Sequence, residues 1–170
     1  MAFKTWGFDE VAYAADMNRY WVQGLHVFKP ADETVTNSIT VQADDHLILP
    51  LAANTDYWME CLVIYNAPTA NDMQLGWTAP AGATMEWSNN GIALAAADAV
   101  DRISRTALGV SSVATIGGSG GDAICAMKGL LRVGGTAGNL QMRFAQATAG
   151  AGTSVVIKAG SMLMLTRLKA

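Results

Sequence analysis

Asp44, Asp45 and His46 form the one short patch of this sequence whose residue types suit metal binding. Carboxylate oxygens and imidazole nitrogens are common metal ligands in proteins. Successive residues of a strand point to opposite faces, so Asp45 and His46 would not converge on one ion. We therefore interpret the patch as a solvated turn that leads into a strand, and we predict no metal site.

Catalytic chemistry is not indicated by the remaining polar residues. His26 and His46 are the two histidines, and a Ser-His-Asp or Cys-His set meets only in space, so the sequence leaves it open. The glycine cluster 117–121 lacks the Gly-Lys-Ser/Thr ending of a phosphate loop and is interpreted as a flexible loop. Glu60 and Glu86 lie within predicted strands, and nothing in their spacing indicates a carbohydrate-active pair. No catalytic residue and no cofactor are predicted.

The tryptophans and cysteines of the central region are expected in the interior. Trp58, Trp77 and Trp87 could form a platform for sugar stacking, but their placement on alternating strands favours core or interface packing. Cys61 and Cys125 both lie in apolar runs, and no export signal is visible. Buried thiols are therefore favoured over a disulfide.

Composition narrows the class of protein. The chain has 170 residues, a length typical of one domain. Its charged residues make up 15%, against about 25% in an average soluble domain, and its net charge is −3. This charge disfavours a nucleic-acid partner, and no apolar run reaches the roughly 20 residues of a membrane-spanning helix. The shortage of charge predicts that apolar surface is buried between subunits.

From Asp32 onward the sequence predicts strands. Short runs rich in β-branched and aromatic residues recur, with turn residues between most of them. No helical pattern separates them, which disfavours a parallel α/β sheet. The expected fold class is all-β, an antiparallel jelly-roll sandwich over 31–170. The strands are expected at 34–36, 39–41, 46–49, 57–65, 73–77, 84–87, 124–133, 140–146, 155–158 and 161–168, with one or two more near 101–116.

Residues 1–30 are assigned to a separate N-terminal arm. Within it, Met17, Tyr20, Trp21 and Leu25 recur at helical spacing, which predicts a helical turn. So short a helix is marginal alone, and its apolar stripe must rest on another surface. That surface can be the arm's own domain, two sister arms or a larger assembly. The residues expected to anchor the arm are Trp6, Phe8, Met17, Tyr20 and Trp21.

Two predicted strands, 57–65 and 161–168, are apolar on both faces. An antiparallel sandwich normally leaves one face of each strand in water. The second face is therefore expected to be covered, either by a sister subunit or by a loop or the arm of the same chain. The residues assigned to the subunit interface are Tyr57, Met59, Leu163 and Leu165.

Seven stretches of the chain form a longer pattern. They are Asp44–Trp58, Leu75–Thr84, Lys128–Leu131, Gly135–Met142, Phe144–Gln146, Ala159–Leu163 and Leu165–Arg167. Together they resemble a recurrent β-module of tailed-bacteriophage virion proteins, especially from phages of actinobacteria. The segment Ala14–Tyr20 looks like the short segment that precedes such modules in phage tail and minor structural proteins. The resemblance covers nearly the whole chain.

The resemblance implies a trimeric jelly roll, similar to tumour-necrosis-factor-like domains, and it implies no catalytic residue. The expected function is a non-enzymatic virion structural protein, assembled in the host cytoplasm, that forms a homotrimeric tail fibre, tip or head appendage. Its arm would bind other capsid or tail proteins. A capsid decoration is the other expected location, because no long fibre shaft precedes the module. The alternative function is a carbohydrate- or host-receptor-binding module at a fibre tip, with a cell-surface glycan as partner.

Overall fold

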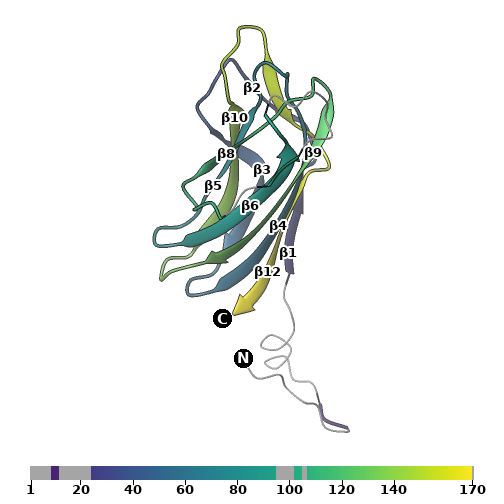
Figure 1. Ribbon diagram of the computed structural model, residues 1–170. Coiled ribbons are helices and arrows are strands. Elements are labelled where there is room, and N and C mark those ends of the chain that lie inside the picture. The colour runs from purple at the N-terminus through teal and green to yellow at the C-terminus, as the bar shows by residue number, and fades with distance from the viewer. Residues whose placement is uncertain (1–8, 12–23, 95–101, 105–106, 170) are drawn as a thin grey trace.

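The computed structural model describes residues 9–11, 24–94, 102–104 and 107–169. These residues form two antiparallel sheets stacked face to face, and no helix occurs among them (Figure 1). The strands are β1 (Gly24–Phe28), β2 (Glu33–Thr36), β3 (Gln42–Leu51), β4 (Asp56–Asn66), β5 (Met73–Thr78), β6 (Thr84–Ile92), β7 (Arg102–Ser104), β8 (Val113–Ile116), β9 (Asp122–Arg132), β10 (Gly138–Gln146), β11 (Ser154–Ile157) and β12 (Met162–Lys169).

The order of the strands is consistent with a jelly-roll-like sandwich. One sheet runs β1-β12-β4-β9-β6-β7, with β11 paired to β4 and β2 paired to β11. The other sheet runs β3-β10-β5-β8. The chain passes from one sheet to the other at most of its connections, for example between β3 and β4 and between β9 and β10. Such crossings between two antiparallel sheets distinguish a jelly roll from a simple meander.

Alternate residues of the strands fill the space between the sheets. Trp77 of one sheet and Trp87 of the other meet edge to face there, with ring centroids 6.3 Å apart. A fully buried large apolar side chain contributes about 1.5–3 kcal/mol, so this layer is the main source of stability. The residues of β4 that point into it are Tyr57, Met59, Cys61, Val63 and Tyr65.

Most predicted strands are confirmed within a few residues, and the region 101–116 contains β7 and β8. The prediction was wrong near the start of β3. Residues 39–41 lie outside any strand, and Ile39 is 57% exposed. Asp44, predicted in a turn, is fully buried within β3. Pro50 does not end this strand but pairs with Asn139 inside it. An edge strand such as β3 tolerates a proline, because one side of it has no ladder to complete.

β1 belongs to the sandwich and not to a separate arm. It pairs with β12 from Gly24 to Phe28. The next residue, Lys29, is buried, and its backbone N–H donates to Ser161 O at 2.8 Å. The start of the sandwich therefore moves from residue 31 to Gly24. Leu25, predicted to belong to the helical turn, lies in strand β1 instead. The rest of that turn and the anchoring residues Trp6, Phe8, Met17, Tyr20 and Trp21 lie outside the described residues. Within the described residues, no helix is long and apolar enough to span a bilayer.

Two glycines of the cluster 117–121 allow backbones to approach closely. A Cβ on Gly117 would lie 2.3 Å from Ala93 O, and a Cβ on Gly118 would lie 2.4 Å from Ala67 O. The N–H of Gly118 also donates to Asp72 Oδ1 at 2.9 Å. This part of the cluster is therefore a packed crossing of backbones, and the predicted flexible loop does not describe it.

Candidate functional site

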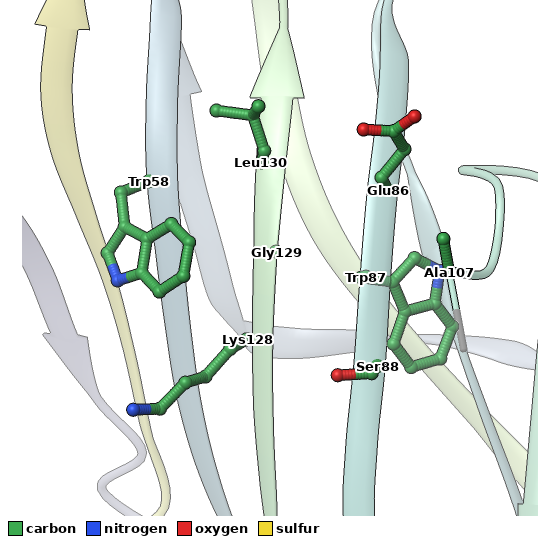
Figure 2. Close-up of a pocket in the computed structure, with 8 residues that line it drawn as sticks. All are labelled: Trp58, Glu86, Trp87, Ser88, Ala107, Lys128, Gly129 and Leu130. Carbon is green, nitrogen blue, oxygen red and sulfur yellow. The ribbon is translucent and has the colours of Figure 1, made fainter. Parts of the chain in front are cut away.

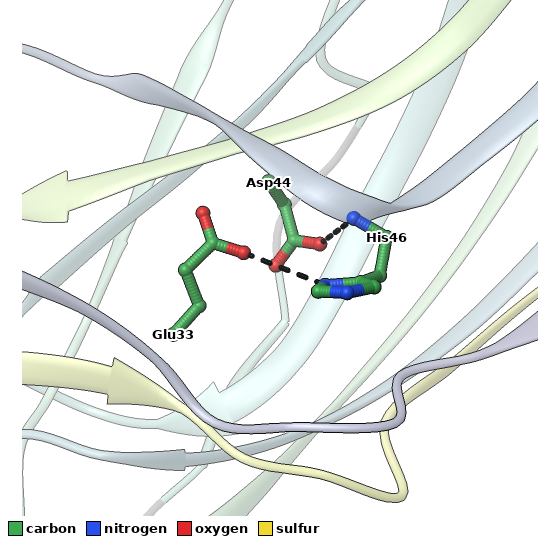
Figure 3. A group of neighbouring side chains, drawn as sticks. All are labelled: Glu33, Asp44 and His46. Atoms are coloured by element: carbon green, nitrogen blue, oxygen red, sulfur yellow. Dashed lines mark hydrogen bonds and ion pairs between the residues drawn. The ribbon is translucent and has the colours of Figure 1, made fainter.

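Four polar side chains meet where the loop after β1 crosses β3. Lys29 Nζ donates hydrogen bonds to Glu33 Oε2 at 2.6 Å and to Asp44 Oδ2 at 2.8 Å. His46 Nδ1 lies 3.4 Å from the same nitrogen. Glu33, Asp44 and His46 point toward one another from two strands (Figure 3). The side chains of Lys29 and Asp44 are both 0% exposed, so this ion pair is shielded from water.

Asp44 is held by hydrogen bonds on both carboxylate oxygens. Its Oδ1 accepts the backbone N–H groups of His46 at 2.9 Å and of Leu47 at 2.8 Å. The register between β10 and β3 shifts between Gln141 and Arg143, beside this position, and Gln141 Nε2 donates to Asp44 O. Such irregularities re-aim a side chain within a sheet. This irregularity places an acid where an apolar residue would be expected.

The cluster has the donor types of a metal site, but an ammonium group lies at its centre. The ligand atoms of Glu33, Asp44 and His46 lie within 4.8 Å of one another. Lys29 Nζ contacts all three of these side chains. The positive charge that a metal ion would supply is therefore already supplied by Lys29. Sequence reasoning considered Asp45 and missed the set, because Lys29 and Glu33 come from other segments.

A second ion pair fixes the loop that carries Lys29 and Glu33. Lys158 Nζ lies 2.7 Å from Asp32 Oδ2, and the N–H of Ala159 donates to Asp32 Oδ1 at 2.8 Å. The hydrogen bond from Lys158, followed by that from Ala159, lowers the pKa of Asp32. The same bond to Asp32 raises the pKa of Lys158. The loop between β1 and β2 is thus tied to the turn before β12.

The nucleophiles considered from the sequence do not form a catalytic set within the described residues. Cys61 and Cys125 are buried and unbridged, as predicted. Burial, followed by the neighbouring Cys125, raises the pKa of the Cys61 thiol well above its usual value, which keeps it protonated and unreactive. The cluster 117–121 also has Gly-x-Ser-x-Gly spacing, which sequence reasoning overlooked. Ser119 Oγ donates to Gly121 O there, and β9 follows where a hydrolase would have a helix.

A broad apolar surface covers the side of the larger sheet that faces away from the other sheet. Strand register places it over β1, β12, β4 and β9. Phe28 is 58% exposed, Ile124 is 48% exposed and Trp58 is 38% exposed. We call this surface the outer face. Its apolar and aromatic members are His26, Phe28, Trp58, Leu62, Ile64, Ile124, Ala126, Leu130, Met162 and Met164.

Two ion pairs of the outer face lie over β4, β9 and the neighbouring β6. Glu60 and Lys128 pair across β4 and β9 at 3.3 Å, and Glu86 and Arg132 pair across β6 and β9 at 3.4 Å. All four side chains are more than 40% exposed, so these pairs contribute little stability. The part of the face over β1 and β12 carries mainly Phe28 and the methionines of β12, with His26 and Thr166 beside them.

A shallow groove of about 300 Å³ lies on the charged side of the outer face. Figure 2 shows the indole of Trp58 on one side of it and Glu86 and Ser88 on the other, with Lys128 and Leu130 from the strand between. An exposed aromatic ring beside charged and hydroxyl groups is an arrangement that can stack on a sugar and hydrogen-bond its hydroxyls. Trp77 and Trp87, by contrast, are each 1% exposed and belong to the core, as sequence reasoning favoured.

The predicted subunit interface is corrected by the burial of its residues. Tyr57, Met59, Leu163 and Leu165 are between 0% and 3% exposed within a single chain. They point between the two sheets, where they contact residues of the same chain and no second copy can reach them. Both strands are indeed apolar on two faces. The face available to a partner is the opposite one, which carries Met162 and its neighbours.

The described fold was also compared with known proteins. No protein-family model matches the chain, and no curated protein matches it. Among solved structures, it is similar to a tripod protein (BppUct-A-L) from the baseplate of bacteriophage Tuc2009, with 12% identity, a TM-score of 0.40, and coverage of 100% of this chain and 79% of that chain. It is also similar to a chain of infectious bursal disease virus, Gx strain, with 9% identity, a TM-score of 0.26, and coverage of 88% of this chain and 41% of that chain. TM-scores of this size do not establish a common fold.

Adjacent substitutions in β12 test the assignment of the two faces. Leu163→Asp places a carboxylate in the core, which costs several kcal/mol out of a total stability of about 5–15 kcal/mol, and we expect it to prevent folding. Met162→Asp places the same group on the outer face and should leave the sandwich folded. Circular dichroism and thermal unfolding measure both. A folded Leu163→Asp protein would show that the faces are assigned incorrectly.

Proposed function

We propose that this protein is a non-enzymatic structural subunit of a bacteriophage virion, which assembles as a homotrimer and is held on the particle by its N-terminal residues. The observation that carries the proposal is the outer face. Large side chains such as Phe28 and Ile124 are exposed there, although the rest of the protein has a well-filled core. Contiguous apolar surface of this kind marks interaction sites on soluble proteins. The family resemblance of the sequence supplies the virion context.

The occupant proposed for the apolar side of the outer face is a second copy of the chain. The low charge content, 15%, agrees with a subunit that buries part of its surface in an assembly. Contacts that repeat head to tail close into a ring when the rotation between copies allows it, and three copies form the ring proposed here. Phe28, Met162 and Leu62, which lie side by side across β1, β12 and β4, would lie at its centre.

The mass of the protein in solution tests the trimer. Light scattering of the full chain should give about three times 17.9 kDa. Met162→Asp should give a folded monomer with the mass of one chain, because an unpaired charge at the interface opposes association. Ile39→Asp is the matched control, since Ile39 is also exposed but lies outside the outer face, and its mass should stay trimeric. A wild-type monomer at micromolar concentration would contradict the proposal.

Deletion of residues 1–23 tests the role of the N-terminal residues. The deletion keeps β1, which the sandwich needs, and removes the proposed anchoring residues Trp6, Phe8, Met17, Tyr20 and Trp21. The shortened protein should fold and associate like the full chain but be missing from purified particles. Mass spectrometry of the particles reads this out. Normal incorporation of the shortened protein would place the attachment surface on the sandwich instead.

The groove beside Trp58 supports a second candidate function, the binding of a host cell-surface glycan. It lies over β4, β9 and β6, so a trimer centred on β1 and β12 leaves it accessible. Trp58→Ala should weaken binding of cell-wall oligosaccharides by about 5- to 150-fold, since stacking on an aromatic ring contributes about 1–3 kcal/mol. Calorimetric titration measures this, with Ile39→Asp as the control. Equal binding by the Trp58→Ala protein would retire this candidate.

A further inference from the structure

The buried cluster around Lys29 has a reactive arrangement that neither the trimer nor the glycan groove uses. We propose that Lys29 and Asp44 join in an intramolecular isopeptide bond, formed by attack of Lys29 Nζ on Asp44 Cγ, with Glu33 as the proton carrier. The reaction would occur once per molecule and would link the segment after β1 to β3 in the opposite sheet. It goes beyond the proposed function and does not depend on it.

The reacting side chains are already in contact. Lys29 Nζ lies 2.8 Å from Asp44 Oδ2, which is one bond away from the carbon to be attacked. Both side chains are 0% exposed, and both are held by surrounding structure. The backbone of Lys29 is fixed on each side, because its N–H donates to Ser161 O and its carbonyl accepts from Gly160 N. Two groups held this close react as if one of them were present at a very high concentration, which accelerates bond formation.

The reaction begins with a proton transfer within the buried pair. Transfer of one proton along the hydrogen bond converts the ammonium and carboxylate into a neutral amine and a carboxylic acid. The ionic forms lose strong hydration when they leave water, whereas the neutral forms lose little. Both side chains of this pair are 0% exposed, so water does not hydrate either group.

The hydrogen bonds to Asp44 suit the charge that develops during attack. As the new C–N bond forms, negative charge gathers on Oδ1. Backbone N–H groups of His46 and Leu47 already donate to Oδ1, at 2.9 and 2.8 Å. Two preorganised N–H donors at this distance form the arrangement that stabilises oxyanions in acyl transfer. The remaining oxygen, Oδ2, is the one that Lys29 contacts and is the leaving group.

Glu33 is placed to carry the proton. Its Oε2 is 2.6 Å from Lys29 Nζ, and the N–H of Asp45 donates to the same oxygen at 3.0 Å, which fixes its position. Glu33 takes a proton from the attacking nitrogen and returns it to Oδ2 as the C–O bond breaks. His46 lies on the more open side of the cluster, with a side chain 37% exposed, where the product water can leave. Figure 3 shows Asp44 between Glu33 and His46, the two side chains assigned to the proton and to the departure of water.

The step balances without any outside reagent. One C–N bond forms and one C–O bond breaks, so the ammonium and carboxylate become a neutral amide and one water molecule. No group is oxidised or reduced, and Glu33 is regenerated. The product replaces two buried charges with an amide, whose oxygen keeps the N–H groups of His46 and Leu47 as donors.

Intact mass of the denatured wild-type protein tests the proposal directly. The mass should be lower than the sequence mass by one water molecule. Cleavage after glutamate separates Lys29, in peptide 11–33, from Asp44, in peptide 34–60, and these two peptides should remain joined. Wild-type protein with the full sequence mass and two separate peptides, after prolonged incubation of the folded protein, would overturn the proposal.

Three variants identify the roles of the residues by the same mass measurement. Lys29→Arg keeps a cation but removes the amine, and Glu33→Gln keeps the shape but removes the base, so both should retain the full sequence mass. Asp44→Asn should form the same amide and lose one ammonia in place of one water, a change that a merely structural ion pair would not produce. Circular dichroism confirms that each variant is folded. A Glu33→Gln protein that loses water as completely as wild type would overturn the role of Glu33.

Discussion

The two-residue period of the strands, together with the stacking of two sheets, determines which surface this protein can offer to a partner. Each residue of β4 or β12 points either between the sheets or away from them. Once Tyr57 and Leu163 enter the core, Trp58 and Met162 must lie on the outer face. A shift of one residue in either strand would exchange the two sets. The outer face is therefore formed by the alternate residues of these two strands that the core leaves out, most of which are also apolar.

Which face of each strand enters the core is also the feature that was predicted incorrectly from the sequence. The strand 57–65 is recognisable because its aromatic and β-branched residues form an uninterrupted run, and the turns around it are marked by Asn and Pro. The signal for its orientation is a single residue, Glu60, which lies in the alternating set of Trp58 and Leu62 and indicates that this set faces outward. The other members of both sets are apolar, and they mask that signal. The missing information is the position of the second sheet, which long-range pairing determines. For this reason the residues predicted at the subunit interface, such as Tyr57, belong to the core face instead.

The Lys29 cluster shows a different limit. Sequence reasoning treated Asp44 as part of a turn, since an isolated acid in a short polar run normally faces water. In the structure, a register shift between β10 and β3 and two backbone N–H donors make a buried place for it. Its partners, Lys29 and Glu33, come from segments that meet β3 only after folding. A lysine between Phe28 and Pro30 gives no local sign of such a role.

The pairing of Gly24 with Thr166 makes the two ends of the sandwich different. The first strand of the sandwich, β1, lies beside the last strand, β12. Gly24 and Lys169 therefore lie at the same end of the sandwich (Figure 1). The loops 37–41, 67–72 and 147–153 gather at the opposite end, because the strands that they join all reach that end together. A foreign peptide inserted between Ala151 and Gly152, which are both exposed, would be displayed on the side away from any fusion partner. The fold is thus suited to use as a display scaffold, because a fusion partner would be attached at one end and the inserted peptide would be exposed at the other.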